Sequence, residues 1–255
     1  ISIPFTALDS EVASLSGDVQ LAIGISAPGG SAYTLFDLQL IPVEEGATSW
    51  TEAPPLKDAL LPWFEYFGFA VTAPELQNPY IAEGLAHHCN STTVGNEFKP
   101  DYILGKEPSE FGSYLAGDGK KYQVPASLFF DVVDASLAAC RDNNLSLRGH
   151  TLVWHSQTPK WFFRENFKNT GALVDIPTMN ARQEWYIRSL LEHIKAWEEK
   201  NNAGKRVITS WDVVNEAVSD GANEQYWLRT NGDWFAIYKD DSFIVNAFVL
   251  ANTYA

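Results

Sequence analysis

Two short stretches near the start of the chain alternate between apolar and polar residues, at 19–25 and 33–40. A Gly-Gly-Ser sequence at 29–31 separates them, which is typical of the turn of a β-hairpin. Two or three strands do not form a stable sheet alone. We therefore predict that residues 1–45 are the C-terminal strands of a β-sandwich, followed by a polar, proline-containing linker at 46–59.

From about residue 60 the pattern changes to short apolar runs that alternate with longer amphipathic stretches. Runs rich in β-branched and aromatic residues predict strands, and stretches with helical periodicity predict helices. The predicted strands are 67–71, 89–94, 145–154 and 207–214, and the predicted helices are 79–88, 125–141, 180–200 and 242–251. Strands that alternate with helices of this length are typical of a parallel sheet in an α/β protein.

Two of these helices have a clear apolar face. In the helix at 180–200 the face is formed by Ile187, Leu190, Leu191, Ile194 and Trp197. At its start, Asn180 and Gln183 resemble a capping box. In the helix at 125–141, Leu128, Val132, Ala135 and Ala139 are predicted to share one face.

No glycine-rich dinucleotide motif follows the first predicted strand, so a nucleotide-binding sheet is disfavoured. A barrel of parallel strands is the preferred fold, and such a barrel has eight βα units. The pattern supplies about four of them. We predict a (β/α)8 TIM barrel in which residues 60–255 form the N-terminal half of the domain.

Composition narrows the range of partners. The 255 residues carry a formal net charge of −14, and such an acidic chain disfavours binding to nucleic acid. No apolar run is long enough to span a bilayer, so no membrane partner is predicted. The chain begins at Ile1 without a basic segment, so it is not expected to contain a signal peptide. Cys89 and Cys140 are predicted to be buried free thiols, with a disulfide between them as the open alternative.

Polar and aromatic residues gather where three of the predicted strands end. The segments are 95–100 (GNEFKP), 148–157 (RGHTLVWHSQ) and 211–217 (WDVVNEA). In a barrel of parallel strands, the carboxyl ends meet on one face, and that face carries the chemistry. Glu216 is therefore the first candidate for a catalytic acid.

Each of these segments also has a simpler interpretation. A lone histidine at a strand end is most often a satisfied core group, and a lone Lys99 is most often a solvated surface charge. The position of all three segments at the same end of the predicted sheet favours one shared cleft. No metal site is predicted, because His150 and His155 have no cysteine or carboxylate at ligand spacing, and no cofactor is predicted either.

The motifs at 149–157 and 211–217 closely resemble those of glycoside hydrolase family 10, the endo-1,4-β-xylanases. Residues 96–100 resemble the motif that follows the second strand in that family. The three motifs occur in the family's order, and the resemblance covers roughly residues 60–255. Residues 1–45 resemble, more weakly, the last strands of a carbohydrate-binding module.

The resemblance implies retaining hydrolysis of β-1,4-xylosidic bonds in xylan, with Glu216 as the general acid/base. Asn215 matches the residue that binds the 2-hydroxyl of the sugar. The other matched substrate-binding residues are Asn96, Lys99, His150, Trp154 and Gln157, whereas the role of His155 is less defined. Xylan and xylo-oligosaccharides are the expected partners. Because a polymer cannot enter a cell, the protein is expected to be extracellular (secreted).

Two departures from the family pattern lead to further hypotheses. Gly95 occupies a position where the family usually has a glutamate, so we expect a weakened or reshaped distal subsite on the non-reducing side. The family's nucleophilic glutamate follows the seventh strand, which lies beyond Ala255. We therefore expect residues 1–255 alone to be inactive, and we expect the rest of the barrel to come from further chain or a second polypeptide.

Two alternatives remain at this point. Another retaining barrel glycosidase, such as a cellulase or a mannanase, would also have an Asn-Glu pair at the fourth strand end. Hydrolysis assays on xylan, cellulose and mannan would distinguish these enzymes. A non-catalytic xylan-binding protein is the alternative from a different class, and binding without turnover would identify it.

Overall fold

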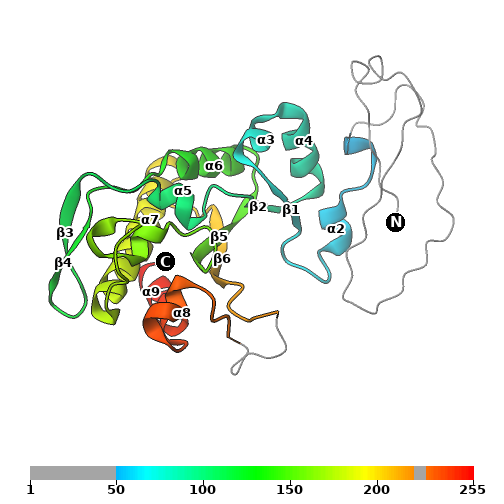
Figure 1. Ribbon diagram of the computed structural model, residues 1–255. Coiled ribbons are helices and arrows are strands. Elements are labelled where there is room, and N and C mark those ends of the chain that lie inside the picture. Colours follow the sequence, from blue (N-terminus) through cyan, green and yellow to red (C-terminus); the bar gives the residue numbers. More distant parts are fainter. Residues whose placement is uncertain (1–49, 221–227) are drawn as a thin grey trace, which may run out of the picture. The chain divides into compact units, whose positions relative to one another are not determined.

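The four predicted strands form one parallel sheet. The computed structural model describes residues 50–220 and 228–255, so the predicted sandwich strands within 1–45 lie outside the described residues. The sheet has the order β1 (Gly68–Val71), β2 (Ser91–Val94), β5 (Ser146–Trp154) and β6 (Ile208–Asn215) (Figure 1). Each adjacent pair is parallel, which confirms the α/β class.

The described helices follow the strands as a βα pattern requires. They are α2 (Leu56–Leu60), α3 (Ala73–Gln77), α4 (Pro79–His88), α5 (Pro100–Leu104), α6 (Asp131–Asp142), α7 (Ile176–Asn201), α8 (Asp233–Tyr238) and α9 (Ser242–Tyr254), with short 3₁₀ turns η1 (Trp50–Glu52), η2 (Lys160–Phe163) and η3 (Glu165–Phe167). The described part of the predicted linker at 46–59 thus contains η1 and most of α2. Among the described helices, none combines the length and apolar character needed to cross a membrane.

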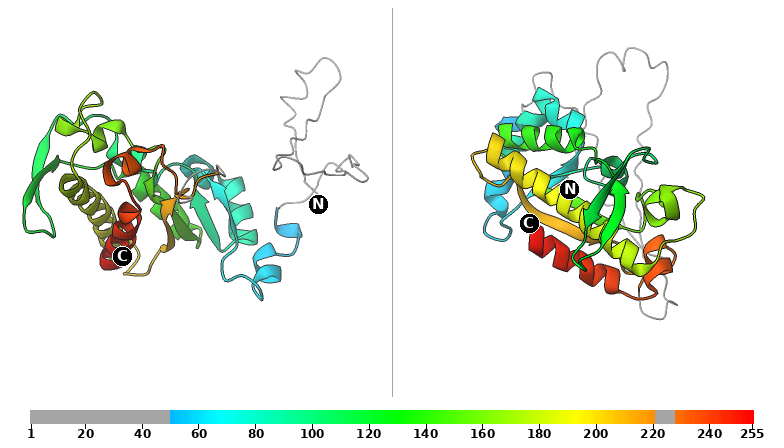
Figure 2. Two further views of the ribbon diagram at one scale, coloured as in Figure 1. Left: turned by 60° about the horizontal axis from the view of Figure 1, so that its bottom comes forward. Right: turned by 90° about the vertical axis from the view of Figure 1, so that its left-hand side faces the viewer.

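The long helix α7 confirms the predicted apolar face and corrects its predicted start. Ile187 and Leu190 are fully buried in the core, and the face packs toward α9 (Figure 2). The capping box at Asn180 is wrong, because the helix begins a turn earlier. The Asp175 carboxylate accepts a hydrogen bond from the Thr178 N–H at 3.0 Å and caps that earlier start. Asn180 instead accepts a hydrogen bond from the Tyr238 hydroxyl at 2.7 Å.

The predicted helix at 125–141 is wrong in its first six residues. Pro125 ends strand β4 (Lys121–Pro125), which pairs antiparallel with β3 (Phe111–Leu115) in a separate hairpin, and α6 begins only at Asp131. Proline suits the first turn of a helix. Because it has no backbone N–H to donate to a neighbouring strand, it also suits an edge strand. The buried face of α6 consequently includes Val133 and Leu137, whereas Leu128 lies outside the helix.

Buried side chains fix the strand ends that matter for the site. Phe98, just after β2, is completely buried and contacts the Trp211 ring of β6 at a centroid distance of 5.8 Å. The Glu97 carboxylate is also buried and accepts hydrogen bonds from the Ala73 N–H at 2.9 Å and the Asn96 N–H at 3.0 Å. These contacts attach the segment after β2 to α3 and to β6. Cys89 and Cys140 are both buried and free.

Candidate active site at the carboxyl ends of the strands

The pairing of β5 with β6 brings two of the three sequence motifs together. Trp154 and Asn215 are direct neighbours in the register, and Glu216 follows immediately after β6. Strand β2 lies on the other side of β5, so the segment that begins at Gly95 faces the same end of the sheet. All the predicted site residues therefore lie on β5, on β6 or in the segments that follow β2, β5 and β6.

Glu216 presents its carboxyl group where a ligand can reach it. Its side chain is 51% exposed, and the Trp154 indole Nε1–H donates a hydrogen bond to Oε2 at 3.0 Å. The backbone of Glu216 is left-handed, with φ +50°. Within residues 50–220 and 228–255, the indole is the hydrogen-bond donor to this carboxyl group, and Oε1 has no donor there, so it can carry or exchange a proton.

His150 is oriented by a neighbouring carboxylate. Its Nδ1 lies 2.9 Å from Oδ2 of Asp212, and Arg148 Nε donates to Oδ1 of the same group at 3.0 Å. Since a carboxylate accepts, Nδ1 carries the proton and Nε2 is left for another partner. Burial raises the pKa of Asp212, but the hydrogen bonds and charges of Arg148 and His150 outweigh burial, so the pKa lies below its usual value.

Lys99 and Asn96 form a polar pair that reaches β5. The Lys99 ammonium donates to Asn96 Oδ1 at 2.8 Å and lies 5.3 Å from the centroid of the Trp154 ring. That ring therefore contacts both the lysine and the Glu216 carboxylate. Through the Trp154 indole, the segment after β2 is linked to Glu216 at the end of β6.

Gln157 lies at the junction between the β5 loop and α5. Its backbone is left-handed, with φ +45°, and its carbonyl accepts a hydrogen bond from the Asp101 N–H at 2.9 Å. Burial raises the pKa of Asp101, and hydrogen bonds that include the Gln157 side chain act in the opposite direction. Gln157 therefore helps to attach α5, with Lys99 just before it, to the loop that follows Trp154.

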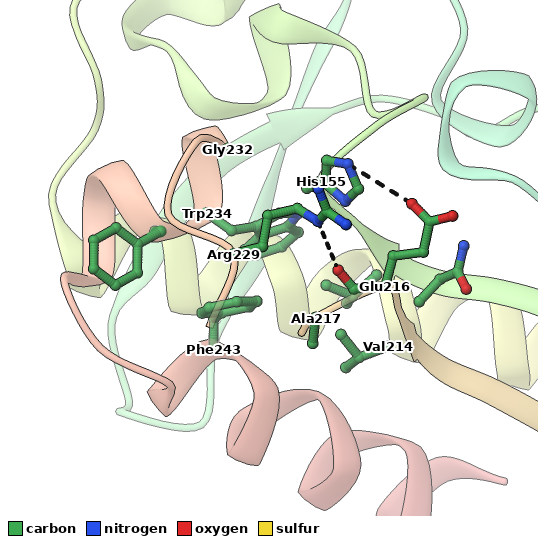
Figure 3. A pocket seen from close by; sticks show the side chains of 11 residues that line it. His155, Val214, Glu216, Ala217, Arg229, Gly232, Trp234 and Phe243 are labelled. Atoms are coloured by element: carbon green, nitrogen blue, oxygen red, sulfur yellow. Dashed lines mark hydrogen bonds and ion pairs between the residues drawn. The ribbon is translucent and has the colours of Figure 1, made fainter. Parts of the chain in front are cut away.

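His155 lines a pocket behind Glu216 together with Arg229 and Trp234 (Figure 3). Its Nε2 lies 3.8 Å from Oε2 of Glu216, too long for a strong hydrogen bond. Burial is the main cause that lowers the pKa of His155, and the positive charge of Arg229 lowers it further. His155 is therefore a neutral imidazole beside the acid at neutral pH.

Two predicted positions are open to a ligand. Asn215 has no hydrogen-bond partner for its side chain within residues 50–220 and 228–255, so its amide is available. Gly95 has room for a side chain, because an added Cβ would lie 3.8 Å from its nearest neighbours, the Thr72 methyl group and the Val71 carbonyl oxygen. Its backbone is also not left-handed, so the glycine is not required by local geometry.

Three charged residues of the site were not predicted from the sequence. Arg148 and Asp212 lie inside the strand motifs, but their pairing depends on the register of β5 against β6. Arg229 lies outside every motif and reaches Glu216 because Leu228 and Arg229 pair with Val218 and Ala217. Within the described residues, no three histidine, cysteine or acidic side chains are grouped so that they could hold a metal ion.

A half-exposed carboxyl group at a strand end, bonded to an indole whose ring also contacts a lysine, is typical of enzymes that act on carbohydrates. The family is glycoside hydrolase family 10, and the chain belongs to it, since residues 55–255 match the model described as "Glycosyl hydrolase family 10". This finding confirms the resemblance carried by the three motifs.

Curated relatives are xylanases by name. The chain is similar to endo-1,4-beta-xylanase A of Butyrivibrio fibrisolvens, with 35% identity over 69% of this chain and 41% of that protein. It is also similar to endo-1,4-beta-xylanase B of the same organism, with 36% identity over 78% of this chain and 28% of that protein. The chain thus spans less than half the length of these relatives.

Solved structures that resemble this chain include xylanases in complex with xylo-oligosaccharides. One is the CBM22-1–GH10 part of xylanase 10B from Clostridium thermocellum in complex with xylohexaose, with a TM-score of 0.61, 31% identity, and coverage of 80% of this chain and 38% of that one. Another is the intracellular xylanase TsXylA of Thermoanaerobacterium saccharolyticum, an E251A mutant with xylotetraose, with a TM-score of 0.62, 27% identity, and coverage of 80% and 54%.

Proposed function

We propose that the protein carrying this chain is an endo-1,4-β-xylanase that hydrolyses xylan with retention of configuration and uses Glu216 as its general acid/base. The observation that carries the proposal is the position of Glu216 after β6, half-exposed and bonded to the Trp154 indole. Family membership and the xylanase names of the relatives support the same substrate class.

The chemistry follows from the free carboxyl oxygen of Glu216. In the first step the acid donates its proton to the glycosidic oxygen as the bond breaks, and in the second step the carboxylate removes a proton from water. His150, whose Nδ1 is bound to Asp212, offers Nε2 to a hydroxyl of the cleaved sugar. Asn96 and Lys99 would bind the sugars on the non-reducing side.

The second carboxylate of the reaction has to come from elsewhere in the protein. Retaining hydrolysis needs two carboxyl groups about 5 Å apart. Within the described residues, the side chains that meet the Glu216 carboxyl group are Trp154 and His155, neither of them acidic. We therefore expect the nucleophile to lie on a later strand of the barrel, of which residues 60–255 form the first four βα units. We also expect a carbohydrate-binding β-sandwich to precede the barrel, and we expect the protein to be secreted.

The test is hydrolysis of xylan, with cellulose and mannan as competing substrates. The protein carrying this chain should release reducing sugar from xylan, and Glu216→Gln should lower kcat/KM by about 10²- to 10⁴-fold, as expected for loss of acid–base catalysis. Residues 1–255 alone should release none. The proposal is wrong if Glu216→Gln retains full activity, or if cellulose or mannan is hydrolysed in preference to xylan.

A further inference from the structure

Arg229 is a largely buried cation beside the proposed acid. Its side chain is only 16% exposed, whereas most arginine side chains are largely exposed. Leu228, the residue before it, forms an isolated β-bridge with Val218, and the Arg229 N–H donates to the Ala217 carbonyl at 2.8 Å. The segment that leaves Glu216 is therefore paired with the segment that carries Arg229.

The guanidinium group binds backbone carbonyls of that first segment. Arg229 Nε donates to the Glu216 carbonyl oxygen at 3.0 Å (Figure 3), and an Nη group donates to the Val218 carbonyl at 3.4 Å. The same Nη group lies 3.2 Å from the Asp220 carboxylate, but Asp220 is 97% exposed, so this ion pair contributes little. The contact to the Glu216 carbonyl is the part that affects the site.

Glu216 has a backbone conformation that needs such support. A φ of +50° is uncommon for a residue with a side chain, and it persists only where the surroundings hold it. The same conformation decides where the carboxyl group points, since a rotation at φ would carry it away from the Trp154 indole N–H. A group that fixes the Glu216 carbonyl therefore also fixes the carboxyl group.

We propose that Arg229 is a positioning residue for the acid/base, which binds the Glu216 carbonyl and so holds the left-handed turn that directs the carboxyl group at the bond to be cleaved. The inference rests on the proposed function of Glu216. Arg229 acts through the backbone of Glu216. A second consequence is that its positive charge helps to keep His155 neutral, against the opposing charges of Glu216 and Asp220.

The first test compares two substrates with the same sugar part. Phenyl β-xylobioside needs protonation of its leaving oxygen, whereas 2,4-dinitrophenyl β-xylobioside does not. In the protein carrying this chain, Arg229→Met should lower kcat/KM at least about tenfold for the phenyl substrate and less than about twofold for the dinitrophenyl substrate. Equal losses on both substrates would indicate a general structural role and overturn the proposal.

Two matched variants complete that comparison. Arg229→Lys keeps the charge but loses the planar fork, so it should show the same substrate dependence with a smaller loss. Asp220→Asn removes the exposed ion pair and leaves the carbonyl contacts, so it should leave both rates unchanged. If Asp220→Asn matched Arg229→Met, the ion pair rather than the carbonyl contact would be responsible and the proposal would be wrong. If Arg229→Met does not fold, Arg229→Lys carries the test. A larger loss on the phenyl substrate than on the dinitrophenyl substrate then supports the proposal, and equal losses overturn it.

A measurement without turnover separates this inference from the proposed function. In residues 1–255, the indole N–H resonance of Trp154, assigned with Trp154→Phe, reports the hydrogen bond to Glu216. Glu216→Gln gives the position of this resonance when the carboxylate acceptor is removed. Arg229→Met should shift the resonance toward that position, and Asp220→Asn should not. An unmoved resonance overturns the inference even if xylan is hydrolysed, and a shift in a protein that hydrolyses nothing supports the positioning contact and rejects the proposed function.

Discussion

The two halves of the site differ in how firmly their side chains are held. In the β5–β6 cluster, formed by Arg148, His150, Trp154, Asp212 and Glu216, each side chain has a hydrogen-bonded neighbour. Arg148 and His150 both bind Asp212, and Trp154 binds Glu216. The β2 cluster, formed by Gly95, Asn96 and Lys99, has one side-chain pair and an open position. In the first cluster, side chains are fixed by neighbours; in the second, the backbone is fixed and the side chains face the cleft.

The difference fits the roles proposed for the two clusters. Proton transfer needs a carboxyl group held within a narrow range of positions, so fixed neighbours are favourable around Glu216. Sugar binding needs hydrogen-bond donors and acceptors that can adapt to a flexible chain of hydroxyl groups. The buried Glu97 carboxylate accepts a hydrogen bond from the Asn96 N–H and so holds the backbone of the β2 cluster. The side chains of Asn96 and Lys99 do not take part in this contact, so they can bind sugar hydroxyl groups. We expect substitutions in the β5–β6 cluster to affect catalysis and those in the β2 cluster to affect affinity.

Apart from loss of Glu216 itself, the largest effect is expected for Asp212→Asn. Loss of the carboxylate removes the acceptor that keeps the proton on His150 Nδ1, and it leaves Arg148 without its partner. A hydrogen bond to a charged group contributes about 1.5–3 kcal/mol, so kcat/KM for xylotetraose should fall by roughly 10- to 150-fold. Steady-state kinetics of the protein carrying this chain would measure this loss.

The control for this prediction is a change of similar charge outside the site. Asp134→Asn removes the carboxylate that contacts His193 on α7 and should leave the kinetics unchanged. If Asp212→Asn changed only KM, Asp212 would belong with the affinity residues, and the proposed contrast between the clusters would fail. If Asp212→Asn and Asp134→Asn lost the same activity, the loss would come from a less stable protein and not from the site.

The sequence predicted which segments lie together better than it predicted the contacts between their side chains. The strand ends were predictable because β-branched runs mark strands, and parallel strands bring their carboxyl ends to one edge. The pairing of His150 with Asp212 was not predictable, because it depends on a register shift between β5 and β6. Arg229 was not predictable either, because its contact with Glu216 depends on the path of the chain after the strand.

The largest error among the predicted elements lies in the segment before α6. Pro125 has the same local pattern at the end of a strand as at the first turn of a helix, and short-range periodicity does not distinguish the two. The pairing of β4 with β3 decides the matter, and that pairing is a contact between distant residues. By contrast, the buried face of α7 was predictable because its period extends over many turns.

Lys99→Met is expected to give the next largest effect, and on affinity alone. The ammonium group is the cation of the β2 cluster and contacts both Asn96 and the Trp154 ring. Its loss should weaken binding of xylotetraose about tenfold, because one hydrogen bond from a charged donor is removed. No change in kcat is expected. Titration calorimetry on the Glu216→Gln protein would measure binding without turnover. Lys168→Met, a surface change of the same charge, serves as the control.

The pH dependence of His155 should give a smaller effect. Burial and Arg229 lower its pKa in the folded protein below the ordinary 6.5. The unfolded chain therefore binds a proton first as pH falls, so the free energy of unfolding should decrease below about pH 6.5 until the folded histidine also titrates. Urea unfolding of residues 1–255 at pH 7.5 and 5.5 should show a larger loss in the native sequence than in His155→Gln. Equal losses would contradict the lowered pKa.

Gly95→Glu should have the smallest effect and is the most direct probe of the open cluster. The nearest atoms to an added Cβ are 3.8 Å away, so a Cβ at this position does not displace its neighbours. Its carboxylate would accept a hydrogen bond from a sugar hydroxyl near Asn96, with a gain of up to about 1 kcal/mol at an exposed site, or a few-fold in affinity. Gly95→Ala tests the backbone change alone and should leave affinity unchanged. Because xylobiose is shorter than xylotetraose, a distal subsite predicts a gain only for the longer ligand. No gain for either ligand would show that the surface at Gly95 does not bind sugar, so that Asn96 and Lys99 would be the sugar-binding residues of the β2 cluster.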